Sequence, residues 1–169
     1  MARDPYLGDE LFTLRAPQAL SLAYLYDTSG LPEALGRSRG GFSTKVHVLC
    51  DALGNPCRFI LTPGQQADVT QAQALLAGEH PDAVIADKGY DSDALLAFIA
   101  DLDAQAVIPP KRNRIEQREL DDHLYAERNK VERLFNRLKH YRRLATRYDK
   151  TARNFLAFWH IASIITLLL

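Results

Sequence analysis

The chain has few cysteines and no apolar segment long enough to suit a membrane. Only Cys50 and Cys57 occur among its 169 residues, and neither belongs to a CxxC pair or has a histidine pair nearby, which argues against a zinc site or a disulfide framework. The most apolar stretch, residues 155–169, is only fifteen residues long and contains His160, whereas a membrane anchor needs a longer run. The polar, acidic residues 1–10 lack the pattern of a signal peptide. We therefore expect reduced cysteines, a cytoplasmic protein and a core helix at the carboxyl end.

The sequence also lacks net charge, because 21 Lys and Arg balance 21 Asp and Glu. The balance is not local: residues 111–153 hold fourteen Lys and Arg against seven Asp and Glu. A chain polarised in this way can carry a basic groove for DNA while its total charge is neutral. Charge alone leaves a second interpretation open, in which the segment is a solvated surface helix. With 47% hydrophobic residues, the chain has apolar material for one compact domain.

The order of the predicted elements is that of an α/β domain built on a mixed sheet. Alternation in residues 44–49, turn residues in 51–56 and an apolar run in 57–61 predict a hairpin. Further strands are expected at residues 83–86 and 105–108, and residues 111–121 are expected to form a loop. Helices are expected at residues 68–76 with Asp68 as N-cap and Gly78 as the stop, from Ser92 or Asp91 to residue 102, from residue 122 onward, and at residues 155–169. Asp91 and Asp93 are interpreted as helix-start residues, where carboxylates gain from the helix dipole.

Four residues of the helix predicted from residue 122 share one face. Tyr125, Arg128, Glu132 and Lys139 are separated by three, four and seven positions, which at about 100° per residue places them within an arc of about 60°. A carboxylate framed by cations and an aromatic ring suits a metal-assisted phosphodiester reaction. The alternative for Glu132 is a surface ion pair with Arg128, worth about 0.3 kcal/mol.

An apolar stripe flanks this face, so Glu132 is expected at the edge of a buried seam. The stripe consists of Val131, Leu134, Phe135 and Leu138. Lys130, Arg133 and Arg137 are expected to point away, toward solvent or DNA. A carboxylate at a core boundary can reach a neighbouring strand end, and Asp87 follows the buried strand 83–86. Active groups of α/β sheets gather at such an edge, although Asp87 could equally cap the following turn.

Further blocks accompany the spacing Y-x2-R-x3-E-x6-K. They are residues 36–45 (GRSRGGFSTK), 51–56 (DALGNP), 61–68 (LTPGQQAD), 86–92 (ADKGYDS), 107–112 (VIPPKR) and 143–158 (RLATRYDKTARNFLAF). Together these blocks and the spacing resemble the DDE transposases of bacterial insertion sequences. The resemblance covers residues 33–169 and leaves residues 1–32 as a segment unlike the family.

The resemblance implies a ribonuclease H-like fold, in which a mixed sheet is flanked by helices, and a two-metal site for Mg²⁺ or Mn²⁺. It implies that Asp87 and Glu132 are catalytic and bind metal, and that Arg128 and Lys139 contact phosphates near the scissile bond. Tyr125 would stack on a base or order the start of the helix, and packing alone is its alternative role. Other cations would extend the phosphate track with little base specificity: Arg133, Arg137, Arg142, Arg143 and Arg147.

A third carboxylate is expected on the first strand, before the hairpin, but the corresponding family block is absent, so that strand is missing or replaced. Asp27 is the candidate, because it closes the apolar run 20–26 (LSLAYLY). The linker from Asp27 to Gly36 is shorter than in the family. The helical DNA-recognition segment that precedes the catalytic region in the family is also missing, which predicts a partial transposase.

The sequence therefore predicts the catalytic part of an insertion-sequence transposase, which cuts double-stranded DNA at the element ends and joins it to target DNA. We expect it in the bacterial nucleoid, either self-associated or paired with an upstream-frame transposase product. The main alternative is an inactive DNA-binding remnant that inhibits a full-length transposase. An unrelated ribonuclease H-like nuclease such as a resolvase would leave the spacing and the flanking blocks unexplained.

Overall fold

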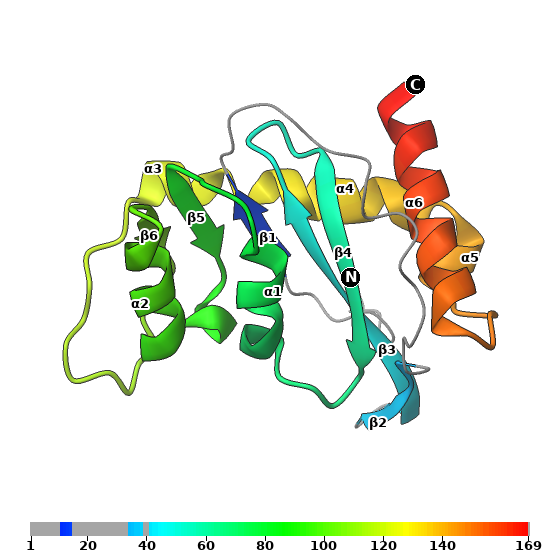
Figure 1. Cartoon of the computed structure of the whole chain (residues 1–169), viewed down its shortest axis with the longest axis horizontal. Coiled ribbons are helices and arrows are strands. Elements are labelled where there is room, and N and C mark those ends of the chain that lie inside the picture. The colour runs from blue at the N-terminus through cyan, green and yellow to red at the C-terminus, as the bar shows by residue number, and fades with distance from the viewer. Residues whose placement is uncertain (1–10, 15–33, 39–40, 169) are drawn as a thin grey trace.

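The computed structural model describes residues 11–14, 34–38 and 41–168. Within these residues, six strands form one mixed sheet in the order β2-β3-β1-β5-β6, with β4 paired to β3 (Figure 1). The strands are β1 (Leu11–Leu14), β2 (Gly36–Ser38), β3 (Gly41–Cys50), β4 (Pro56–Pro63), β5 (Ala83–Ala86) and β6 (Gln105–Val107). The helices are α1 (Ala72–Leu76), α2 (Asp93–Asp101), α3 (Asp122–Ala126), α4 (Asn129–Lys139), α5 (Arg142–Ala145) and α6 (Ala152–Leu168), and the 3-10 turns are η2 (Asp68–Gln71) and η3 (Lys88–Tyr90). The predicted α/β class with a mixed sheet is confirmed.

The predicted hairpin is formed by β3 and β4, which pair antiparallel from Thr44 opposite Pro63 to Leu49 opposite Arg58. The Asp51 carboxylate organises the turn, because its Oδ1 accepts hydrogen bonds from the backbone N–H groups of Leu53 and Asn55 at 2.8 and 2.9 Å. This is the local bonding that favours Asp at the start of a turn.

The cysteines lie at the two ends of this turn and are both free thiols, as expected. Cys50 is buried and Cys57 is half-buried. Burial raises the pKa of the Cys50 thiol well above its ordinary value and that of Cys57 to about 12. Both thiols are therefore poor nucleophiles and poor metal ligands at neutral pH.

Strand β1 lies between β3 and β5, parallel to the former and antiparallel to the latter. Leu11 pairs with Val48, and Thr13 pairs with Ile85. Residues directly opposite each other on adjacent strands belong to the same face of a sheet, so Val48 and Ile85 share a face. The apolar run 20–26, which the sequence offered as a first strand, lies outside the described residues.

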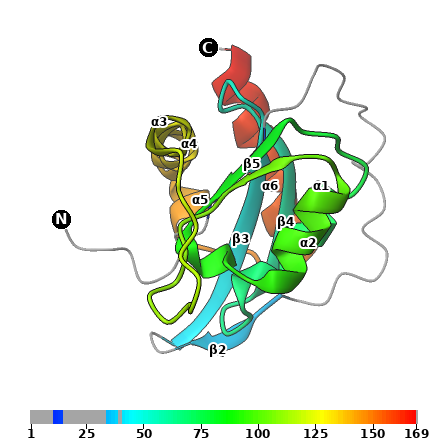
Figure 2. The same cartoon turned by 90° about the vertical axis from the view of Figure 1, so that its left-hand side faces the viewer.

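The sheet is covered on both faces. Alternate residues of β3 enter different cores: Val46 and Val48 pack with α4 and α6, whereas Leu49 packs with α1 and α2. Figure 2 shows α4 and the α1–α2 pair on opposite sides of the strands. The basic helix α4 thus has one face in the core and one face exposed.

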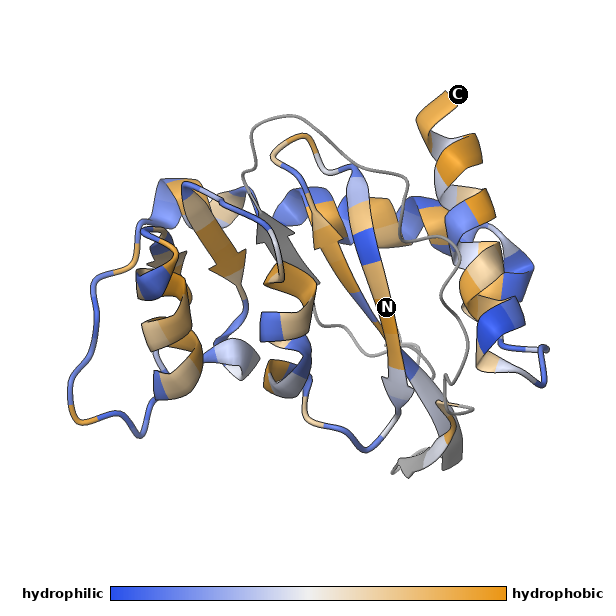
Figure 3. Cartoon of the chain, viewed as in Figure 1, coloured by the Kyte–Doolittle hydropathy of each residue, from blue (hydrophilic) through white to orange (hydrophobic). Residues whose placement is uncertain are grey.

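Helix α6 confirms the prediction of a core helix at the carboxyl end. Its Trp159 is fully buried and lies 5.6 Å from the Phe59 ring of β4 and 5.7 Å from the Phe135 ring of α4, between centroids. Beyond this core, Ile161 and Ile164 are half exposed, and Figure 3 shows this end of α6 as apolar. None of the helices among the described residues is long and apolar enough to cross a membrane.

The helix expected at residues 68–76 differs from the prediction at its start. It consists of η2 followed by α1, and Ala67 precedes η2 without a side-chain cap. Asp68 is not the N-cap, because its carboxylate accepts two hydrogen bonds from Lys45 Nζ at 2.8 and 2.9 Å. Gly78, at φ +77°, follows the end of α1 as expected.

Candidate active site

Asp87 directly follows the buried strand β5 at its carboxyl end. Ala83 and Ile85 of β5 pack against Tyr125 of α3, and Asp87 continues the alternation of these two residues. Its Oδ1 accepts a hydrogen bond from the Gly89 N–H at 2.6 Å, which caps η3. Among the described residues, Oδ2 accepts no hydrogen bond. Asp87 therefore caps the turn with one oxygen, and its other oxygen is not used by the turn.

The single helix expected from residue 122 is wrong, because it is divided into α3 and α4. At the junction the N–H groups of Glu127 and Arg128 donate to carbonyl oxygens three residues back, each at 3.1 Å. Such 3-10 bonding winds the chain more tightly than an α-helix. Helix α3 packs on β5, whereas α4 packs on β3 and β4, so the tight turn lets the two helices follow a twisted sheet.

Three of the four residues predicted to share a face contact one another across this junction. The Arg128 guanidinium carbon lies 5.7 Å from the centroid of the Tyr125 ring. Its Nη2 lies 2.5 Å from Glu132 Oε1. Residues three apart eclipse in a 3-10 turn, which brings Arg128 over Tyr125. Lys139 follows on the last turn of α4, where it is half-buried.

Glu132 lies at the edge of the buried seam, as the apolar stripe predicted. Its neighbours Val131 and Leu134 are buried against the sheet, whereas its own side chain is 44% exposed. At such exposure the ion pair with Arg128 contributes little to stability. Among the described residues, Glu132 Oε2 accepts no hydrogen bond.

Most of the cations predicted to extend the phosphate track are exposed, whereas others are bonded within the chain. Arg133, Arg137, Arg142 and Arg143 are exposed, and the guanidinium of Arg143 stacks on the Phe158 ring at 4.4 Å from its centroid. Lys130 was expected to point toward solvent or DNA; its side chain is 37% exposed, but its ammonium group is bonded within the chain. It pairs with Glu127 and donates to the Ala52 carbonyl oxygen at 2.8 Å, because the β3–β4 turn packs against α4.

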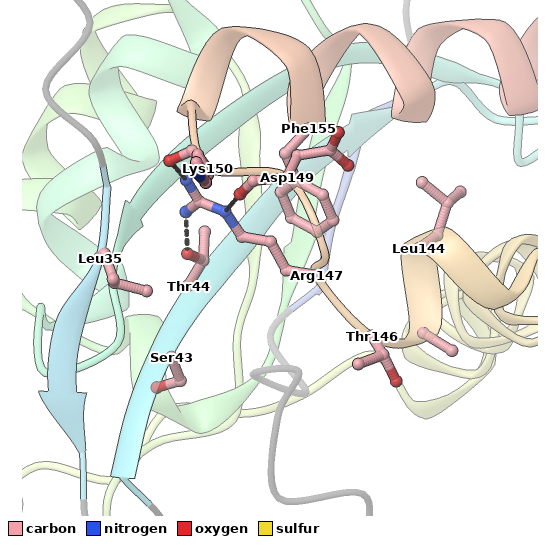
Figure 4. A pocket seen from close by; sticks show the side chains of 10 residues that line it. Leu35, Ser43, Thr44, Leu144, Thr146, Arg147, Asp149, Lys150 and Phe155 are labelled. Carbon is pink, nitrogen blue, oxygen red and sulfur yellow. Dashed lines mark hydrogen bonds between the residues drawn. The ribbon is translucent and has the colours of Figure 1, made fainter.

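Arg147 points inward, into a pocket of about 280 Å³ between β3 and the chain before α6 (Figure 4). Its Nη1 donates to Thr44 Oγ1 at 2.5 Å, and its Nε and Nη2 donate to the carbonyl oxygens of Asp149 and Lys150. The guanidinium also lies 5.4 Å from the Phe155 ring. These bonds tie the start of α6 to the sheet and direct Arg147 away from a phosphate track.

A metal site would be built from Asp87 and Glu132 among the described residues. No group of three or more His, Cys, Asp or Glu side chains suited to a metal ion occurs there, and Asp27 lies outside the described residues. Carboxylate oxygens are the ligands that Mg²⁺ prefers. One oxygen of each carboxylate is without a hydrogen bond in the described structure, so the two residues fit the metal chemically.

Asp91 was predicted to be a helix-start residue, and that prediction is wrong. Ser92 caps α2, accepting from the Leu95 N–H at 3.3 Å, whereas the fully buried carboxylate of Asp91 binds Arg114 and Arg118 at 2.6 and 2.8 Å. Burial works to raise the pKa of Asp91, but hydrogen bonds from Arg114, the Lys111 N–H and Arg118 outweigh it and lower the pKa to about 2. No local pattern could have indicated these partners, which are distant in sequence.

A second buried polar cluster joins β3, β4 and η2. His47 Nε2 hydrogen-bonds Thr62 Oγ1 at 2.8 Å, and its Nδ1 lies 3.9 Å from Asp68 Oδ1. Asp68 in turn binds Lys45. Burial lowers the pKa of His47 to about 4, although Asp68 acts in the opposite direction. His47 is thus neutral at pH 7, and the cluster is structural in its observed bonding.

Residues 28–167 match the model of the family described as transposase DDE domain. The chain belongs to this family. Membership confirms the resemblance to insertion-sequence transposases that the sequence blocks carry.

Two relatives illustrate the match. The chain is 45% identical over 122 residues to a putative transposase for insertion sequence element IS6501 from Brucella ovis, covering 71% of this chain and 94% of that protein. It is 32% identical over 133 residues to a putative transposase for insertion sequence element IS402 from Burkholderia cepacia, covering 72% of this chain. The chain spans 60% of the length of that second relative. No solved structure matches the chain significantly.

Proposed function

We propose that this chain is the catalytic part of an insertion-sequence transposase, which cleaves DNA and joins the freed strand to a target. The proposal is supported by membership of the DDE family together with the positions of Asp87 and Glu132 in the fold. Asp87 follows β5 and Glu132 lies on α4. Val48 of β3 packs under α4. The strand register through β1 places Ile85 of β5 on the same face of the sheet as Val48.

Asp87 and Glu132 are proposed to hold the divalent ions, Mg²⁺ or Mn²⁺, through the oxygens that accept no hydrogen bond among the described residues. When bound there, the ions would supply the positive charge that activates a water molecule and stabilises a leaving 3′ oxygen. The water oxygen would bond to phosphorus and lose a proton to solvent, the bond from phosphorus to the 3′ oxygen would break, and the 3′ oxygen would take up a proton to become a hydroxyl group. The hydroxyl then attacks a second strand in the same way. Arg128 and Lys139 are proposed to bind the phosphates beside the scissile bond.

We further propose that the sheet is a ribonuclease H-like sheet in which Leu11–Leu14 takes the place of the first strand. Its position between β3 and β5 supports this. The third carboxylate is proposed to be Asp27 of this chain. The alternative is that an upstream transposase product supplies it. Replacement of Asp27 by Asn abolishes cleavage by the chain if Asp27 is that ligand. If an upstream product supplies the ligand, cleavage requires that product and the replacement has no effect on it.

The proposed partner is double-stranded DNA, at the element ends and in the target. Exposed cations of α4 and α5 support this, namely Arg133, Arg137, Arg142 and Arg143. Arg147 is the weakest member of the predicted track, because its N–H groups bind chain oxygens. Self-association, or pairing with an upstream product, completes the proposal, and light scattering of the purified chain with and without DNA tests it.

The second candidate is an inactive DNA-binding remnant that inhibits a full-length transposase. Asp87 and Glu132 are the two proposed metal-binding carboxylates of the described residues, and a chain without a third would bind DNA without cleaving it. Both candidates predict DNA binding, whereas only the first predicts cleavage.

The deciding experiment measures Mg²⁺- or Mn²⁺-dependent cleavage of DNA that carries the element ends. The wild-type chain is compared with Glu132→Gln and Asp87→Asn, and Asp101→Asn on the exposed side of α2 is the matched control. We expect both site variants to lose cleavage by at least about a hundredfold and the control to retain it. If the wild type and both site variants are equally inert while binding DNA, the remnant is the correct description.

A further inference from the structure

The loop between β6 and α3 is bonded to the same turn that carries Asp87. Asp87 precedes η3 and Asp91 follows it. Asp91 Oδ2 accepts from the Lys111 N–H at 2.8 Å and from Arg114 Nε at 2.6 Å, and Oδ1 accepts from Arg118 Nη2 at 2.8 Å. Strands β5 and β6 are parallel, so the turn and the loop leave the sheet at the same edge.

This loop, residues 111–118, is held in one shape although it contains no helix or strand. The Arg114 N–H donates to the Lys111 carbonyl oxygen at 3.0 Å. The Gln117 side chain donates to the carbonyl oxygens of Lys111 and Arg114 at 3.3 and 3.0 Å. Arg114 also binds Asp93 at 2.7 Å. A loop ordered in advance loses little conformational entropy when it binds a partner.

The loop presents cations, an amide and an apolar side chain to solvent. Lys111, Arg112 and Asn113 are exposed, and Ile115 is 102% exposed. Glu116 is the exposed anion beside them. Asp91 and Asp93 neutralise Arg114 and Arg118, so the loop's outward charge is concentrated at Lys111 and Arg112. Proteins that enter the minor groove combine Arg, Lys and Asn contacts with an apolar wedge such as Ile.

We propose that residues 111–118 form a second DNA-contact element, which binds the duplex beside Asp87. Lys111 and Arg112 contact phosphates, and Ile115 packs against the sugars or base edges of the minor groove. Asp91 is a positioning residue, because it orders the loop and touches no DNA itself. The inference rests on the proposed function, since it requires DNA as the partner.

The test is binding of the full chain to a fluorescein-labelled duplex of random sequence, measured by anisotropy between about 50 and 200 mM salt. The double variant Lys111→Ala/Arg112→Ala is expected to bind about tenfold more weakly at low salt and to lower the slope of log K against log salt by about two. Ile115→Ser is expected to weaken binding without changing that slope, since it removes no charge. Arg153→Ala, an exposed cation of α6, is the control and is expected to bind like the wild type.

Asp91→Asn separates positioning from contact. It is expected to lower affinity and to admit protease cleavage within residues 111–118, which a change confined to the exposed side chains would not cause. If the Asp91 variant does not fold, the variants of Lys111, Arg112 and Ile115 still decide the matter, because their side chains are exposed. Wild-type affinity and slope in those variants overturn the inference.

The failure of this inference can be distinguished from failure of the proposed function. Arg142→Ala/Arg143→Ala removes two exposed cations of α5. If that pair weakens binding and the loop variants do not, the proposed function stands and the loop is not a contact. If the wild-type chain does not bind the duplex at low salt, both proposals fall.

Discussion

The ammonium group of Lys130 donates a hydrogen bond to the Ala52 carbonyl oxygen at 2.8 Å, across 78 positions of sequence. The bond joins the first turn of α4 to the β3–β4 turn. Gly54 of that turn lies against the same side chain, because a Cβ added to Gly54 would be 3.1 Å from Lys130 Cβ. Glu132 follows on the same helix, so the hairpin turn helps to fix the orientation of the proposed metal ligand.

Lys130→Met is expected to lower the free energy of unfolding by about 1 kcal/mol, the typical contribution of one such hydrogen bond. Urea denaturation followed by circular dichroism measures the change. Arg133→Met is the control, because Arg133 is exposed on the same helix and its replacement should change stability by less than about 0.5 kcal/mol. Equal stabilities of the two variants would show that the bond to Ala52 does not contribute.

Gly54→Ala is expected to destabilise the chain more than Gly78→Ala does. Both glycines have positive φ, +86° and +77°, which costs a residue with a Cβ about 1 kcal/mol. A Cβ at Gly78 meets nothing within 4 Å, whereas at Gly54 it meets Lys130. The difference between the two unfolding free energies therefore isolates the contact with α4, and a difference of zero would contradict it.

The parts of the fold that depend on neighbouring residues were predictable from the sequence. Asp51 closes its turn with residues two and four positions later, and a buried strand does end directly before Asp87, at Ala86. Such features follow from local alternation and turn chemistry. The contacts of Arg128 with Tyr125 and Glu132 likewise join residues only three and four positions apart, although a 3-10 junction divides the expected helix there.

The parts that depend on distant partners were not predictable. The local sequence around Asp91 is typical of a helix start. Its actual partners lie 20 to 27 residues later, in the loop that packs against it. In sequence, Lys130 resembles the exposed cations of its helix, but in the structure it contacts the hairpin turn. In each case a long-range contact, which no periodicity records, decides whether a charged side chain faces solvent or the protein.

Arg147→Gln is expected to act on stability more than on DNA binding. The variant loses hydrogen bonds to Thr44 and to the carbonyl oxygens of Asp149 and Lys150, and Thr44 is buried, where an unsatisfied acceptor costs about 1–3 kcal/mol. Arg142→Gln, an exposed cation nearby, is the matched variant and is expected to weaken DNA binding with little change in stability. Thermal unfolding and anisotropy together separate the two roles. If Arg147→Gln binds DNA more weakly while its stability is unchanged, Arg147 contacts phosphates as first predicted.

His47 is expected to make the protein less stable as the pH falls from about 6.5 to about 4. The pKa of His47 is about 4 in the folded chain against an ordinary value of 6.5. Within this window the unfolded chain binds a proton that the folded chain does not, so the free energy of unfolding decreases as the pH falls. The full effect is about 3 kcal/mol, reached near pH 4.

The variant His47→Gln tests this pH dependence, because an amide can bond Thr62 and does not titrate. Chemical denaturation at several pH values between 7 and 4 should show a flatter profile for the variant than for the wild type. Asp68 and Lys45 face His47 and are retained, so their contributions remain in both proteins. His123→Gln, at an exposed position of α3, controls for loss of a histidine as such. If His47→Gln and the wild type lose stability in parallel, the buried imidazole is not the group that makes the fold acid-sensitive.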